Sequence, residues 1–151
     1  MSAVARHTKL KIRRVKRSDA EQVALLSGQL GYLATSAQIL RRIKGLKPAS
    51  EHAVFVADLP AIGIVGWLHV SVAHVLESDT RAEVNGLIVG EGQRSLGAGA
   101  QLLDAAEKWA RQRRCTAMNV RSNVIRERAH KFYERQGYEH YKTQKAFRKT
   151  L

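Results

Sequence analysis

The stretch Val89-Gly90-Glu91-Gly92-Gln93-Arg94-Ser95-Leu96-Gly97-Ala98-Gly99-Ala100 is the most informative part of this chain of 151 residues. A strand-like apolar run precedes it. A helix-like pattern follows it, with an amphipathic stripe of Leu102, Leu103, Ala106, Trp109 and Ala110. Glycine allows a close approach of the backbone to a ligand, and the first turn of a helix has free N–H groups. The stretch therefore predicts a turn that can hold an anion such as a pyrophosphate.

Two familiar phosphate-binding motifs are excluded at this turn. The Gly-Lys-Ser/Thr ending of a P-loop is absent, and Leu102 stands where a dinucleotide fingerprint needs a third small residue. Isolated glycine pairs are weak evidence, so a merely flexible strand-to-helix loop remains the alternative interpretation.

Hydropathy patterns predict the elements around the turn. A strand at residues 10–15 comes before a helix that begins with a capping box of Ser18 and Glu21 and ends at Gly31. A second helix is expected at 35–46, a hairpin from strands 53–58 and 62–71, and a strand at 82–89. After the helix that ends near 113, a strand at 116–120, a helix at 124–136 and a last strand at 138–147 are expected. In the helix at 124–136, Ile125, Ala129 and Phe132 should share one face.

The order β-α-α-β-β-β-α-β-α-β predicts an α/β (α+β) protein with one domain over residues 1–151. Helices alternate with strands only in the second half, which favours a mixed central sheet of about six to seven strands flanked by helices.

Composition excludes several classes. A single cysteine, Cys115, cannot form an intramolecular disulfide, and the Cys and His residues lack zinc-site spacing. Residues 1–17 are basic but lack the apolar core of a signal peptide, and the apolar runs are too short to span a bilayer. We therefore expect a cytoplasmic protein without a metal or a membrane partner.

The formal net charge is +13, from 26 basic and 13 acidic residues. A balance of this kind indicates a polyanionic partner. The charge is unevenly distributed, however. Residues 48–107 hold two basic and eight acidic residues, whereas the segments on both sides are strongly basic.

The segment Arg94-Ser95-Leu96-Gly97-Ala98-Gly99 matches the [RQ]-x-x-G-x-[GA] signature of the GNAT superfamily of N-acetyltransferases. The resemblance covers nearly the whole chain. Ile12-Arg13 with Ser18-Asp19-Ala20, Ile64-Val65-Gly66-Trp67, and Phe132-Tyr133-Glu134 with Gly137-Tyr138 resemble other elements of that family in the same order. The chain is identified as a member, with a GNAT-like fold.

The resemblance implies that acetyl-CoA is the co-substrate. Its pyrophosphate would lie on the turn, and its pantetheine arm would run beside the fourth strand, where the N–H of Val89 or Ile88 would polarise the thioester carbonyl. Asn123 or Arg126 would meet the pantetheine, although many members have Asn where Arg126 stands. The cofactor-binding residues expected on this basis are Leu87, Ile88, Val89, Arg94, Ser95, Leu96, Gly97, Ala98, Gly99, Ala100, Asn123 and Arg126.

Tyr133 occupies the position that resembles the family's general acid, which protonates the leaving thiolate. Glu83 lies near the place of a general base in some members, and Asn85 shares its strand face by period two. The alternatives are a packing role for Tyr133 and a solvated strand-edge position for Glu83. His69 and His74 are weaker candidates, because a single histidine in a strand is more often structural.

The acceptor is expected to be a primary amine, either a small cationic amine or a peptide or protein amine. Glu77 and Asp79 lie in the loop before Glu83 and favour a cationic substrate. A nucleic-acid- or ribosome-associated protein and an acyl-CoA sensor without turnover are the competing hypotheses. The low aromatic content of 6% argues against nucleic acid. Family members are often dimers, so a homodimer is a further expectation.

Overall fold

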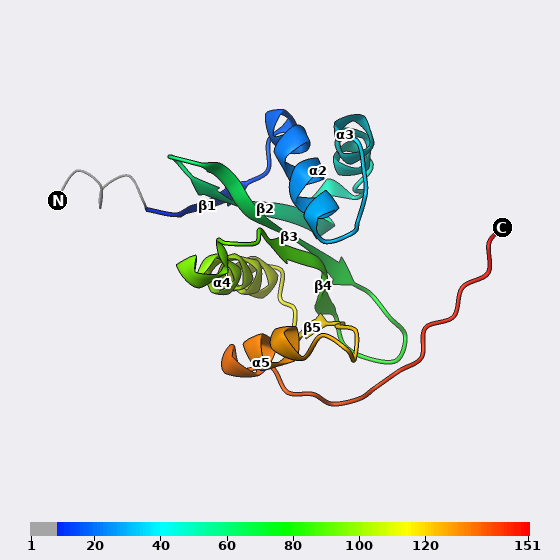
Figure 1. Cartoon of the computed structure of the whole chain (residues 1–151). Coiled ribbons are helices and arrows are strands. Elements are labelled where there is room, and N and C mark those ends of the chain that lie inside the picture. The colour runs from blue at the N-terminus through cyan, green and yellow to red at the C-terminus, as the bar shows by residue number, and fades with distance from the viewer. Residues whose placement is uncertain (1–8) are drawn as a thin grey trace. The chain divides into compact units, whose positions relative to one another are not determined.

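The computed structural model describes residues 9–151, so part of the basic N-terminal segment analysed above lies outside the described residues (Figure 1). The chain forms two compact units, Met1–Val120 and Arg121–Leu151, and each is described by itself. The expectation of a single domain stays a prediction. Among the described residues, every helix is too short or too polar to cross a membrane.

The elements of the larger unit follow the expected order. They are β1 (Lys11–Arg14), α2 (Ala20–Gln29), α3 (Ser36–Lys44), β2 (His52–Leu59), β3 (Gly63–Ala73), β4 (Arg81–Val89), α4 (Ala98–Gln112) and β5 (Met118–Val120). Three short 3-10 helices, η1 (Arg17–Asp19), η2 (Ala49–Glu51) and η3 (Arg94–Leu96), connect them. The smaller unit contains α5 (Glu127–Arg135).

One sheet in the order β1-β2-β3-β4-β5 forms the centre of the larger unit. The first three pairings are antiparallel, and β4 pairs with β5 in parallel. The mixed sheet with helices confirms the predicted α+β class. It has five strands, fewer than expected.

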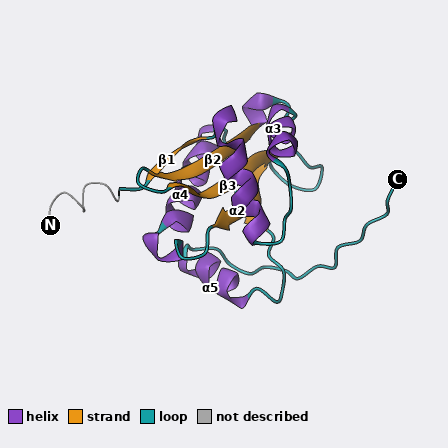
Figure 2. Cartoon of the chain, turned by 45° about the horizontal axis from the view of Figure 1, so that its top comes forward, coloured by secondary structure: helices purple, strands orange, loops and turns teal. Residues whose placement is uncertain are grey.

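Helices cover both faces of this sheet. Helices α2 and α3 lie on one face and α4 lies on the other (Figures 1 and 2). The core under α2 and α3 includes Val23, Leu26 and Ile39 against Val56 and Ile88 of the sheet. On α4, the predicted stripe is confirmed, because all of its members are buried: Leu102, Leu103, Ala106, Trp109 and Ala110.

The predicted capping box of Ser18 and Glu21 does not form. Asp19 stands at the start of α2 instead, and its carboxylate accepts the N–H of Lys16 at 2.7 Å. Arg13 holds the same carboxylate through two hydrogen bonds of 2.8 and 2.9 Å. A buried ion pair thus fixes the entry of the helix, and the sequence pattern could not reveal its partner in β1.

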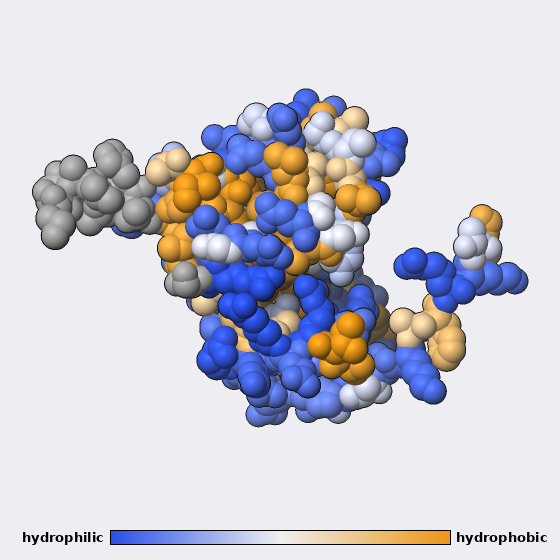
Figure 3. Space-filling model, in the orientation of Figure 1, coloured by the Kyte–Doolittle hydropathy of each residue, from blue (hydrophilic) through white to orange (hydrophobic). Residues whose placement is uncertain are grey.

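Two predictions at the C-terminal end are wrong. Helix α5 begins at Glu127, so Ile125 precedes it and is exposed rather than sharing its face. Residues 138–151 form neither helix nor strand. Alternating residues give only a local tendency to extend, whereas a strand also needs a paired neighbour. The segment is mostly hydrophilic, with exposed apolar residues such as Tyr141 and Phe147 between the basic ones (Figure 3).

Candidate active site

The Gly-rich turn connects β4 to α4. Gly92 and Gly97 both have φ of +75°, a backbone conformation that side chains with a Cβ rarely adopt. Gly97 is the residue before the first turn of α4, and its carbonyl accepts the N–H of Gln101 at 3.1 Å. Arg94 and Leu96 of η3 are exposed on the same turn.

The N-cap residue of α4 is Gly97, which has no side chain to cap the helix. The N–H groups of Ala98, Gly99 and Ala100 precede the first intrahelical bond and are therefore free donors. The helix dipole adds partial positive charge at the same place. The turn is thus built to hold an anion.

Beyond Val84, β4 has an open edge on the β5 side, because no other strand of residues 9–151 pairs with it there. The pairing of β4 with β5 ends at Val84 and Val120, whereas β4 continues to Val89. The N–H of Gly90 donates to the carbonyl of Val65 at 2.8 Å, and the carbonyl of Ile88 also faces β3, beside Gly66.

Backbone groups alternate in direction along a strand, so the N–H groups of Leu87 and Val89 point to the open edge and those of Ile88 do not. The open edge and the turn are continuous in sequence. Together they form a track for an extended ligand that ends in an anionic group.

A β-bulge lies at the start of this open edge. Val84 pairs with Val70 and Gly86 pairs with His69, which leaves Asn85 as an extra residue on β4. The amide Nδ2 of Asn85 donates to Oγ of Ser71 at 2.8 Å. The bulge therefore separates a half of β4 that pairs with β5 from a half that does not.

Polar side chains gather on the α2/α3 face beside the bulge. We call this group the polar cluster. It contains His52, His69, Ser71, Glu83 and Asn85. Ser71 is at its centre, because it pairs with His52 on one side and with Glu83 on the other. The shared face of Glu83 and Asn85 agrees with the prediction from the sequence.

Glu83 is not a free carboxylate. Nε of Arg81 donates to Oε1 of Glu83 at 2.9 Å, and only 13% of the Glu83 side chain is exposed. The ion pair holds the Glu83 side chain on this face of β4.

His52 and His69 form a pair that the sequence reasoning did not predict. Nδ1 of His52 and Nε2 of His69 are 3.0 Å apart, and the rings are stacked. Burial, and secondly the charge of His52, lowers the pKa of His69 to about 4, so its ring is neutral at pH 7. Of this pair, only His69 was a candidate from the sequence, because a register shift between Ala57 and Asp58 conceals from the sequence which residues of β2 and β3 face each other.

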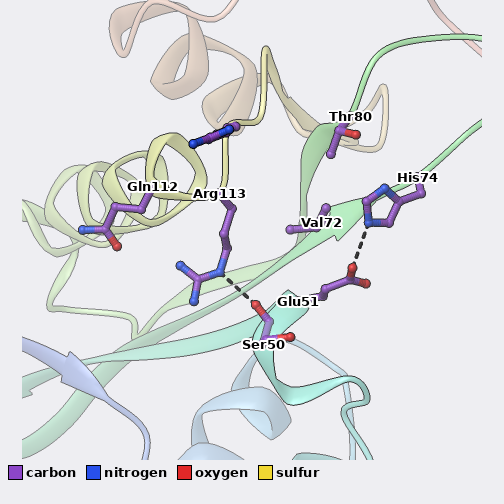
Figure 4. A pocket seen from close by; sticks show the side chains of 8 residues that line it. Ser50, Glu51, Val72, His74, Thr80, Gln112 and Arg113 are labelled. Carbon is purple, nitrogen blue, oxygen red and sulfur yellow. Dashed lines mark hydrogen bonds and ion pairs between the residues drawn. The ribbon is translucent and has the colours of Figure 1, made fainter.

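Glu77 and Asp79 are exposed in the loop between β3 and β4, residues 74–80. We call it the acceptor loop, after the role predicted for these two residues. His74, at the start of that loop, lies outside the polar cluster. Its Nε2 contacts Oε1 of Glu51 at 2.8 Å beside a pocket of about 570 Å³. In Figure 4, Arg113 reaches Ser50 across the same pocket, where its Nε donates to the Ser50 carbonyl at 2.8 Å.

This pocket is not the turn that precedes α4. Gln112 and Arg113 line it at the C-terminal end of the helix. The Gly-rich turn is at the other end, about 20 Å away at the rise of an α-helix.

The remaining predicted residues belong to the smaller unit. The ring of Tyr133 packs edge-on against Phe132 and Tyr138, and burial raises the pKa of its phenol. Oδ1 of Asn123 accepts the N–H of Ile125 at 3.2 Å, and the Asn123 carbonyl accepts the N–H of Arg126 at 3.0 Å. Asn123 precedes α5, Arg126 is its N-cap residue and Tyr133 lies within it.

The edge of β4 beyond Val84 and the start of α4 are suited to an extended ligand with an anionic end. The sequence matches the model of the acetyltransferase (GNAT) family over residues 31–138. The chain therefore belongs to this family and to the class of acetyl-CoA-dependent N-acetyltransferases. None of the curated proteins matches it.

Solved structures show the same fold. A transcriptional regulator from Bacillus halodurans C-125 is 25% identical, with a TM-score of 0.78 over 92% of this chain and 100% of that chain. The aminoglycoside N-acetyltransferase AAC(6')-Iy, solved in complex with CoA, is 20% identical, with a TM-score of 0.82 over 95% of this chain and 97% of that chain. Glucosamine-6-phosphate N-acetyltransferase from Arabidopsis thaliana is 18% identical, with a TM-score of 0.80 over 93% of this chain and 98% of that chain.

Proposed function

We propose that this acetyltransferase moves the acetyl group of acetyl-CoA to a primary amine by direct attack while both substrates are bound. The observation that supports this most is the open edge of β4 leading into the N-terminus of α4. An extended arm can add to a strand edge through main-chain hydrogen bonds, and a pyrophosphate suits a helix N-terminus. When bound, acetyl-CoA supplies the thioester that the amine attacks.

The chain's own backbone would do most of the holding. Ala98, Gly99 and Ala100 offer free N–H groups to the pyrophosphate, while Arg94 adds positive charge. Leu87 and Val89 offer N–H groups at the open edge, and one of them would donate to the thioester oxygen as negative charge develops. Asn123 and Arg126 stay predicted contacts from the smaller unit.

Two side chains are proposed for proton transfer. Tyr133 would donate a proton to the departing thiolate. Burial raises the pKa of its phenol, so the proton to be donated is present at neutral pH. Glu83 is the candidate base from the sequence, and its Oε1 accepts a hydrogen bond from Nε of Arg81 beside the bulge.

The acceptor would be a small cationic amine or an amine of a peptide or protein. The exposed Glu77 and Asp79 next to β4 support a positively charged substrate, because opposite charge attracts it to the loop. Aminoglycoside and amino-sugar acetyltransferases share the fold at low identity, which fits an amine of this class.

The test is a thiol-release assay with acetyl-CoA and an amine panel of spermidine, neamine, glucosamine 6-phosphate and a lysine-containing peptide. We expect at least one cationic amine to accelerate CoA release and to gain one acetyl group by mass spectrometry. Tight acetyl-CoA binding with no amine-dependent release would instead identify a sensor. Binding to RNA or DNA with a steep salt dependence, without release, would support the nucleic-acid alternative.

A further inference from the structure

The indole ring of Trp67 lies over β4 where the open edge begins. Trp67 is opposite Ile88 in the pairing of β3 with β4, and it packs on the α2/α3 face of the sheet. A Cβ on Gly86 would stand 2.8 Å from both Cη2 and Cζ3 of the indole. Carbon atoms in contact are normally separated by about 3.5 Å or more. The missing side chain of Gly86 therefore leaves room for the far end of the ring.

Apolar contacts, and not a hydrogen bond, hold this ring in place. The Nε1 of Trp67 is buried and has no hydrogen-bond partner among residues 9–151. The side chain packs against the core under α2 and α3, and its far end contacts β4 at Gly86. The ring is only partly buried, so it keeps a surface that a bound molecule can contact.

The acyl end of a CoA thioester would come to the same place on β4. Its pyrophosphate suits the N-terminus of α4, which follows Val89 in the chain. An arm along the open edge would therefore run back from Val89 toward the bulge at Asn85. The acyl group is at the far end of this arm, beside Leu87 and Gly86. A strand added to a sheet edge lies about 4.8 Å from its neighbour, so the indole over Gly86 would border the acyl group on the α2/α3 face.

We propose that Trp67 restricts the acyl donor of this enzyme to acetyl-CoA. The indole closes the α2/α3 side of the acyl site, so a longer acyl chain meets the ring. This inference rests on the proposed function, because it requires an acyl-CoA along the open edge of β4. One additional methylene group in an apolar pocket can change discrimination by about 10-fold or more. Gly86 contributes to the same restriction, since its lack of a side chain lets the ring lie over β4.

The main experiment measures binding, so it needs no acceptor amine. Calorimetry gives the affinities of CoA, acetyl-CoA, propionyl-CoA and butyryl-CoA for the wild type, Trp67→Phe and Trp67→Ala. We expect the wild type to bind butyryl-CoA at least about tenfold more weakly than acetyl-CoA, and Trp67→Ala to bind the two within about threefold. Trp67→Phe should lie between them. The affinity for CoA itself should be the same in all three proteins.

Trp109→Phe is the matched control. Trp109 is the second tryptophan of the chain, and its buried Nε1 also lacks a hydrogen-bond partner among the described residues, but it lies on α4. This variant should keep the wild-type ratio of butyryl-CoA to acetyl-CoA affinity. It also leaves Trp67 as the only tryptophan, so fluorescence reports on the site directly. We expect acetyl-CoA to change the emission of Trp67 more than CoA does.

A further variant tests the contact between the ring and β4. In Gly86→Ala the new Cβ would displace the indole, so the ratio of butyryl-CoA to acetyl-CoA affinity should change. When Gly86→Ala is combined with Trp67→Ala, the ratio should equal that of Trp67→Ala alone, because no ring is left to displace. Such non-additivity is expected of residues in contact.

The outcomes separate the inference from the function on which it rests. An equal ratio of butyryl-CoA to acetyl-CoA affinity in the wild type and in Trp67→Ala would overturn the inference and leave the proposed function standing. An equal loss of affinity for CoA and all three acyl donors would also overturn it, because Trp67 would then have a purely structural role. If the wild type binds neither CoA nor acetyl-CoA, the proposed function fails, and the inference fails with it.

Discussion

Arg13 holds two carboxylates, Asp19 at the start of α2 and Asp58 at the end of β2. The Arg13–Asp19 contact is bidentate, and the Asp19 side chain is only 6% exposed. Such paired, charge-assisted hydrogen bonds are stronger than neutral ones. This small network ties β1 and the start of α2 to the end of β2.

We expect Asp19→Asn to lower the free energy of unfolding by about 2 kcal/mol at pH 7. The hydrogen bonds from Arg13 lower the pKa of Asp19, so its contribution is present above the unfolded value of about 3.9 and is lost as the pH falls through the folded value. Urea unfolding from pH 7 to pH 3 should therefore show a shrinking difference between variant and wild type. The exposed Glu21→Gln is the control, and an equal loss there would contradict the assignment.

Tyr133→Phe removes only the hydroxyl that is proposed to protonate the thiolate. Burial raises the pKa of this phenol, so it is protonated at neutral and mildly alkaline pH. We expect kcat to fall about 100-fold while acetyl-CoA affinity stays the same. Steady-state kinetics and calorimetry check the two parts. An unchanged kcat would remove Tyr133 from the mechanism.

At the scale of elements, the turn before α4 makes a sharp prediction. Gly97 has φ of +75° and Gly31, after α2, has φ of +83°, and neither has a close neighbour where a Cβ would stand. Alanine at either position should destabilise the chain by about 1 kcal/mol. Only Gly97→Ala should also weaken CoA binding, by about tenfold, because it disturbs the turn that orients the N–H donors. Equal CoA affinity in both variants would place the pyrophosphate elsewhere.

The acceptor loop gives a second prediction for an element. Replacing Glu77 and Asp79 with Gln and Asn removes two exposed acidic charges next to β4. We expect KM for a cationic amine to rise by about threefold to tenfold at low salt, with a smaller change at high salt, because salt screens exposed charges. A KM that does not change would show that the loop does not attract the substrate.

Local patterns predicted most of the elements. The stripe on α4 and the hairpin of β2 and β3 are confirmed. Both features depend on residues close together in the sequence: the spacing of apolar residues along one helix, and the turn between two successive strands. The last strand was wrong, since pairing depends on a partner that residues 138–147 do not specify. The histidine pair and the Arg13–Asp19 contact were missed for a related reason. Each depends on the register between strands or on contact between elements distant in sequence.

At the scale of the whole molecule, the acidic and the basic residues behind the net charge of +13 belong to different parts of the fold. The sheet edge, the polar cluster and the acceptor loop belong to the acidic segment 48–107, whereas α5 and the residues after it are basic. The net charge of the whole chain therefore favours a polyanionic partner, whereas the acidic segment favours a cationic substrate at the proposed site. The position of the charges along the chain, and not their sum, separates these two interpretations.

The two compact units lead to a prediction about cooperativity. If residues 1–151 fold as one domain, differential scanning calorimetry should show a single transition whose calorimetric and van't Hoff enthalpies agree. Two resolved transitions, with the smaller one lost when the chain is shortened to end at Val120, would establish separate folding units instead.

The extra residue at Asn85 has a consequence for how such a protein can diversify. A bulge absorbs a change of register, so alterations between Arg81 and Val84 need not rotate Leu87 and Val89 away from the open edge. Residues around Glu83 in the half of β4 proposed to face the acceptor can change while the half proposed to hold acetyl-CoA keeps its alignment. A new amine specificity could thus evolve in this chain without rebuilding the apparatus for the acyl donor.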